Sequence, residues 1–182
     1  MNKVRLIFKS VTEIVGSDDV GLLILVDEQQ RQLTIPCDRN MLYQFSLRVQ
    51  KVPITNMMLP EVLWQVIHSQ TTMRFEILIN DLIEGQYRAV LYNIETLEPI
   101  LIRISDAMLL AYVSDIPVYI DEKLMKKQSV KYVHNAQGMS IPVNTLTDEM
   151  LKKALNKAIE DEHYELASLL RDEMKRRNLL DI

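Results

Sequence analysis

The segment from Pro99 to Ile120 constrains the fold most, because it predicts a strand, a helix and a second strand with almost no residues between them. β-Branched isoleucines alternate within 100–104, which suits a pleated, half-buried strand. Residues 105–113 predict a short and very apolar helix. Asp115 and Pro117 end this helix, since the residue before proline is pushed out of helical geometry. Such a helix is marginal alone. We therefore expect it to be buried, with the rest of the chain packed around it.

Composition excludes several classes of protein. The only cysteine, Cys37, leaves no internal disulfide framework and no cysteine-based zinc site, and it makes a reduced, cytoplasmic setting the default. We expect this thiol to be buried. The longest apolar run falls far below the ~20 residues of a membrane helix. The net charge of −4 gives no bulk attraction to nucleic acid, so any DNA or RNA must be held by a local basic patch.

The order of elements predicts an α+β fold with an internal duplication, because three strands followed by a helix occur twice. The two β-β-β-α units would form a mixed or antiparallel sheet assembly. Asp38 precedes the first of these helices and can cap it. The expected strands are 4–14, 21–26 and 32–37 in the first unit and 73–79, 87–92 and 99–104 in the second.

A further helix is expected between the two units. Pro60 opens it, in the first turn, where proline is tolerated. Apolar side chains follow at helical spacing, and such a stripe usually faces a core. We expect its inner face to consist of Val62, Leu63, Val66 and Ile67.

The last part of the chain predicts an αα-hairpin after a linker at 135–146. The domain boundaries expected are therefore 1–134 and 147–182. Thr147 is a good N-cap, and the charged run 160–162 indicates a bend between two helices. Two helices have too little core to be stable alone, so their apolar faces must meet something. The apolar stripes are Leu151, Leu155 and Ile159 in the first helix and Tyr164, Ala167, Leu170 and Met174 in the second.

Residues 103–111, with the sequence Arg-Ile-Ser-Asp-Ala-Met-Leu-Leu-Ala, and the following strand Ile116–Ile120 resemble the signature of the bifunctional nuclease (BFN) domain family. That signature is Arg-x-Ser-Asp-Ala-x-x-Leu-Ala followed by a proline-hydrophobic strand, with a proline usual where this chain has Ile104. The resemblance implies a bacterial, cytoplasmic hydrolase that cleaves RNA or DNA at phosphodiester bonds. It places Arg103, Ser105 and Asp106 nearest the catalytic site.

Two interpretations of these residues stay open. In the first, Ser105 and Asp106 only cap the helix, because a serine and an aspartate before an apolar helix are a common start signal. A nuclease, however, needs a carboxylate as general base or as ligand of a divalent metal such as magnesium or manganese, and a cation to stabilise the phosphate. The metal ligands stay unknown. Asp38, Asp81 and Asp121 are further candidate carboxylates, and the histidines lack metal-ligand spacing.

The C-terminal helices resemble the UVR motif, the short helical hairpin named for the UvrB and UvrC repair proteins. The resemblance implies a module for protein interaction, by partner docking or self-association, and hence a homo-oligomer. Tyr164 and Leu170 would be anchors, and Arg171 would form charged pairs. The matching residues are Leu151, Leu155, 158–160, Glu162, 164–167 and 170–174.

Two functions from different classes follow. The first is a metal-assisted nuclease acting on RNA or DNA, with the hairpin recruiting partners. The second is a non-catalytic adaptor that links to DNA-repair or protease machinery. The net negative charge favours it. Asp38 favours it too, because it is shifted from the acidic residue that family members often carry at the start of the helix after the third strand. Carboxylates clustered around Asp106 would favour the nuclease. An exposed apolar face at Tyr164 and Leu170 would favour the adaptor.

Overall fold

The computed structural model describes residues 2–14, 17–132 and 146–179. The chain forms two compact units, one of Met1–Asp81 with Tyr87–His134 and one of Leu82–Gln86 with Asn135–Ile182. The linker expected at 135–146 lies almost wholly outside the described residues. In the part of the chain that is described, every helix is too short or too polar to cross a membrane.

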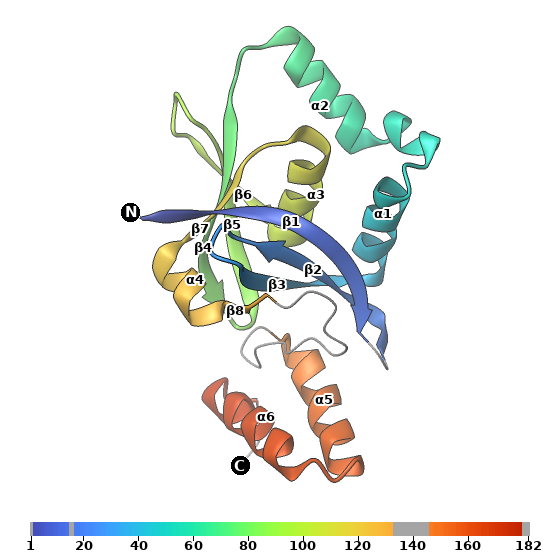
Figure 1. Ribbon diagram of the computed structural model, residues 1–182, viewed down its shortest axis with the longest axis vertical. Coiled ribbons are helices and arrows are strands. Elements are labelled where there is room, and N and C mark those ends of the chain that lie inside the picture. The colour runs from blue at the N-terminus through green and yellow to red at the C-terminus, as the bar shows by residue number, and fades with distance from the viewer. Residues whose placement is uncertain (1, 15–16, 133–145, 180–182) are drawn as a thin grey trace. The chain divides into compact units, whose positions relative to one another are not determined.

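A mixed sheet of eight strands in the order β6-β5-β4-β7-β1-β2-β3-β8 organises the first unit (Figure 1). β4 and β7 run parallel, whereas β1 runs antiparallel to both β2 and β7. β2–β3, β3–β8 and β5–β6 are antiparallel pairs as well. The strands are β1 (Lys3–Ile14), β2 (Ser17–Val26), β3 (Arg31–Asp38), β4 (Phe75–Ile83), β5 (Gln86–Asn93), β6 (Pro99–Arg103), β7 (Val118–Asp121) and β8 (Val130–Lys131).

Three strands followed by a helix occur twice along the chain, so the predicted α+β fold with two β-β-β-α units is confirmed. β1–β3 lead into α1 and β4–β6 lead into α3, and Figure 1 shows these two helices beside the sheet. The helices are α1 (Arg39–Val49), η1 (Pro53–Met57), α2 (Leu59–Gln70), α3 (Ile104–Ser114) and α4 (Glu122–Gln128). α3 ends where expected, at Asp115, which adopts a left-handed φ of 56°, just before Pro117.

β2 is the central strand of the core, because Leu22–Val26 are all nearly inaccessible to solvent. α1 packs directly over this strand at Gly21. A Cβ atom at that position would lie 2.8 Å from Cδ1 of Leu42 and 3.1 Å from Sγ of Cys37. A larger residue at this position would therefore force the Leu42 side chain to shift, and glycine lets α1 lie this close to the sheet without that change.

Three aromatic rings join the sheet to the helices of both repeats. Phe8 on β1 stacks on Phe45 of α1 with ring centroids 5.3 Å apart. Tyr112 of α3 meets both rings edge-on, at 5.2 Å from Phe8 and 5.8 Å from Phe45. Edge-to-face and stacked pairs of this kind add about 0.5–1.5 kcal/mol each beyond the burial of their area. The cluster therefore holds α1 and α3 next to each other.

The prediction that one apolar face of α2 is buried is wrong for most of the residues of that face. Val62, Leu63 and Val66 are exposed, and the helix has no fully buried residue. The reason is an ion pair that the apolar pattern does not reveal. Arg48 of α1, whose side chain is 3% exposed, donates from Nε and Nη2 to the two carboxylate oxygens of Glu61 at 2.7 and 2.9 Å. This pair turns the Glu61 side of α2 inward and the apolar stripe outward.

The second unit contains the predicted helical hairpin of α5 (Asp148–Glu160) and α6 (Tyr164–Arg176). Thr147 caps α5 as expected, because its hydroxyl oxygen accepts a hydrogen bond from the Met150 N–H at 3.3 Å. The two helices bury a small core of their own. Its buried members are Leu146, Leu151, Ala158, Ala167, Leu170 and Met174, with Met150, Ala154, Leu155 and Leu179 packed against them.

Candidate functional site

The junction between β3 and α1 is built as the sequence predicts. Asp38 is the last residue of β3 and the N-cap of α1. Its carboxylate accepts a hydrogen bond from the Met41 N–H at 2.7 Å, which satisfies one of the free donors at the helix start. The Asp38 side chain is otherwise exposed.

The equivalent junction between β6 and α3 differs from the expectation. The helix begins at Ile104, one residue earlier than predicted, and its N-cap is Arg103, which makes no side-chain cap. Ser105 therefore lies inside the first turn, and its predicted role as an N-cap is wrong. The physical reason is that β6 ends at Arg103, so the helical backbone has already started when the chain reaches the serine.

Arg103 and Asp106 form a two-bond ion pair at this junction. Nε of Arg103 lies 2.6 Å from Oδ2 of Asp106, and Nη2 lies 3.2 Å from Oδ1. The pair is open to solvent, with the arginine side chain 70% and the aspartate side chain 41% exposed. The hydrogen bonds and charge of Asp106 raise the pKa of Arg103 above its ordinary value. The guanidinium therefore presents a permanent positive charge at the start of α3.

The two junctions lie close together in space. Asp38 joins β3 to α1, and the charge of its carboxylate is the smallest of the effects that raise the pKa of Arg103, after those of Asp106. α3 also contacts both α1 and β3. The fold thus brings Asp38, Arg103, Ser105 and Asp106 to one exposed corner, although 65 residues or more separate Asp38 from the others. The one feature of the sequence that indicates this proximity is the strand-to-helix junction that occurs in both repeats.

This corner does not supply a complete set of protein ligands for a metal ion. Within 2–14, 17–132 and 146–179 there is no group of three histidine, cysteine, aspartate or glutamate side chains that could hold one. Asp106 is already paired with Arg103. Of the other carboxylates considered, Asp121 caps α4 by accepting from the Lys123 and Leu124 N–H groups, and Asp81 is an exposed residue of β4.

The remaining candidate residues serve the fold or the surface. Cys37 is buried as expected, and this burial, aided by the Asp38 charge, raises the pKa of the thiol to about 12. His68 stacks on Trp64 with centroids 5.9 Å apart, and His163 directly precedes α6. His134 lies outside the described residues.

On the hairpin, the three residues expected to bind a partner lie in different environments. Tyr164 is 68% exposed and Arg171 is also on the surface, whereas Leu170 is 1% exposed between the two helices. Leu170 therefore supports the hairpin from inside. The exposed apolar side chains also include Leu166 and Leu169, which sequence reasoning missed because they fall beside the stripe that packs on α5.

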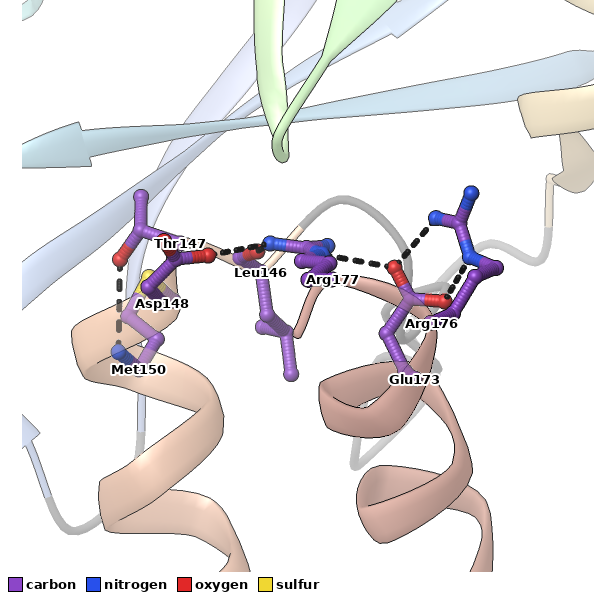
Figure 2. A network of polar contacts seen from close by, with 7 residues as sticks. All are labelled: Leu146, Thr147, Asp148, Met150, Glu173, Arg176 and Arg177. Carbon is purple, nitrogen blue, oxygen red and sulfur yellow. Dashed lines mark hydrogen bonds and ion pairs between the residues drawn. The ribbon is translucent and has the colours of Figure 1, made fainter. Parts of the chain in front are cut away.

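Arg177 closes the open end of the hairpin, where the start of α5 meets the end of α6 (Figure 2). Its Nη1 donates to the Leu146 carbonyl at 2.7 Å and to the Asp148 carboxylate at 3.0 Å, while Nε donates to Glu173 at 2.8 Å. Arg176 holds both oxygens of Glu173 from the other side, at 2.6 and 2.8 Å. These charged bonds lower the pKa of Glu173, the one to Arg176 most.

The fold and this corner define an α+β domain with two equivalent strand-to-helix junctions, followed by a helical hairpin. The family model described as the bifunctional nuclease domain matches residues 22–133, and the model described as the UvrB/uvrC motif matches residues 144–177. No curated protein matches the chain. Because the first match covers more than half of the 182 residues, the chain belongs to the bifunctional nuclease domain family. The second match indicates a protein-interaction motif.

The geometry of the two helix starts predicts that truncating Asp38 destabilises the protein more than truncating Ser105. Asp38→Ala should lower the free energy of unfolding by about 1 kcal/mol, because it leaves the Met41 N–H without its side-chain partner. Ser105→Ala should change it by less than about 0.5 kcal/mol, because Ser105 caps nothing. Urea unfolding of the full chain measures both, and Asp38→Asn, which keeps an accepting oxygen, is the control. An equal loss for both alanine variants would contradict the assignment.

The ion pairs of Glu173 predict a stability that depends on pH. Because its pKa is lowered in the folded hairpin, Glu173 contributes stability that is complete above the ordinary glutamate value of 4.5 and is lost as pH falls through the lowered value. Glu173→Gln should remove this contribution, so that wild type and variant converge in acid. Amide hydrogen exchange of α6 across this pH range measures the difference. Glu165→Gln, on the exposed side of the same helix, is the control and should behave like wild type.

Proposed function

We propose that the first unit binds single-stranded RNA or DNA at the corner of Asp38, Arg103, Ser105 and Asp106 and hydrolyses a phosphodiester bond there. Membership of the bifunctional nuclease domain family supports this assignment. The observation that carries it is the solvent-open pair of Arg103 and Asp106, with Asp38 close by. This corner combines a permanently charged guanidinium, two carboxylates and a hydroxyl.

The residues divide the chemistry between them. The planar guanidinium of Arg103 suits two-point binding of phosphate oxygens, and the free N–H groups in the first turn of α3 favour the same anion. Phosphate binding draws Arg103 away from Asp106 and frees that carboxylate as a general base. Asp106 then takes a proton from water as the water oxygen bonds to phosphorus. The bond from phosphorus to the leaving oxygen breaks, and that oxygen takes a proton from solvent. Ser105 donates a hydrogen bond to the phosphate.

The hairpin serves as the interaction module in this proposal. Tyr164, Leu166 and Leu169 expose apolar surface that its internal core does not use, and Arg171 adds a charge beside them. A protein partner that buries these side chains would bring the nuclease unit to its substrate. Leu170 maintains the helix spacing that presents them. The buried reduced thiol of Cys37 is consistent with a cytoplasmic location.

A non-catalytic adaptor is the second candidate. The observation that favours it is the same exposed apolar set on the hairpin. In addition, the described residues contain no group of three metal-ligating side chains close enough together to hold an ion. In this case the first unit would act as a scaffold, and the partner would belong to the repair or protease machinery.

Cleavage of end-labelled single-stranded RNA and DNA by the purified full chain tests the proposal. Each substrate is run with magnesium, with manganese and with chelator. Asp106→Ala and Arg103→Ala should each lower the cleavage rate by about 100-fold or more, because each removes a group that acts on the reacting phosphate. Asp172→Ala, an exposed carboxylate on the hairpin, is the matched control and should cleave like wild type.

Cleavage that survives Asp106→Ala would contradict the assignment of the site. A folded wild-type protein that cleaves neither substrate under any of the three conditions would favour the adaptor.

A further inference from the structure

The exposed face of α2 carries a continuous apolar stripe that the first unit leaves uncovered. Leu59, Val62, Leu63 and Val66 follow the i, i+3, i+4, i+7 spacing of one helix face, and each is between two fifths and four fifths exposed. Met57 at the end of η1 and Met73 just after α2 extend the set and are also more than half exposed.

The orientation of this stripe is fixed. The bidentate pair between Arg48 and Glu61 holds α2 against α1, and the third guanidinium nitrogen of Arg48 donates to Gln44. Trp64 faces Phe75 of β4 with ring centroids 6.4 Å apart. Residues advance by about 100° around a helix, so the stripe lies opposite Glu61. Turning it inward would break this ion pair and leave the Arg48 guanidinium, whose side chain is 3% exposed, without its carboxylate.

We propose that this face is the interface between two copies of the chain, with the α2 helices packed against each other across a twofold axis. The apolar area is of the right size. At roughly 100 Å² for a fully exposed large aliphatic side chain, the six apolar residues present on the order of 350 Å². This is most of the roughly 450 Å² of apolar area that one partner of a standard interface of about 800 Å² buries.

The charge distribution favours a second copy as the occupant. In a twofold interface each residue lies near its own counterpart, so any net charge on the face repels itself. The exposed face of α2 carries no lysine, arginine, aspartate or glutamate, because its exposed polar residues are Gln65, His68, Ser69 and Gln70, and the only acidic residue of the helix, Glu61, is turned away and paired. The stripe on α2 thus offers most of the apolar area of a standard interface and none of the like charges that would oppose self-association.

The test is the molar mass of the full chain in solution, measured by light scattering during size-exclusion chromatography. Wild type should elute at twice the 21.2 kDa of the chain. Leu63→Asp should elute at the mass of one chain, because the substitution places two carboxylates in the interface. Leu63 is exposed in the single chain, so the variant should fold, with an unchanged far-ultraviolet circular dichroism spectrum.

Two matched controls exchange exposed leucines elsewhere. Leu101→Asp lies on the edge strand β6, where the side chain is 83% exposed, and Leu169→Asp lies on the hairpin. Both should keep the doubled mass. A wild-type protein with the mass of one chain would overturn the proposal and leave the face to a different partner. A doubled mass that survives Leu63→Asp, or that is lost in either control, would overturn it too.

Discussion

The contact among Phe8, Phe45 and Tyr112 is the constraint on which the first unit depends. It is the place where a strand of the first repeat, the helix of the first repeat and the helix of the second repeat meet. Since both helices are fixed by one cluster, their starting points are fixed relative to each other as well. The four polar groups at Asp38, Arg103, Ser105 and Asp106 therefore form a corner as a consequence of apolar packing.

A second constraint acts on α2, and it comes from an ion pair instead of apolar packing. Apolar pattern alone would turn Leu63 and its neighbours toward the core, but the buried pair of Arg48 and Glu61 decides the rotation of the helix. Buried pairs of this kind contribute little net stability, whereas breaking one is costly. Their role here is to specify one arrangement. The consequence is an uncovered apolar surface, which is the basis for expecting a second copy of the chain.

Much of the fold follows from local sequence signals. The strand, helix and strand at 99–120, the cap at Asp38 and the hairpin after Thr147 were predictable because periodicity and capping are encoded in neighbouring residues. The start of α3 was not, since nothing in the sequence shows that β6 ends at Arg103. The environments of Leu63 and Leu170 were also hidden, because an apolar stripe does not reveal which side of it finds a neighbour. The roles of Arg103, Ser105 and Asp106 stay predictions.

The proposed function requires that the starts of α1 and α3 form one nucleic-acid site. Its most direct test is a titration of isotope-labelled protein with a short single-stranded RNA, followed by backbone amide chemical shifts. Amides at the start of α1 (39–41) and of α3 (104–107) should shift together, with one shared affinity. Shifts at only one of the two helix starts, or confined to the lysines of α4 or to the hairpin, would contradict it.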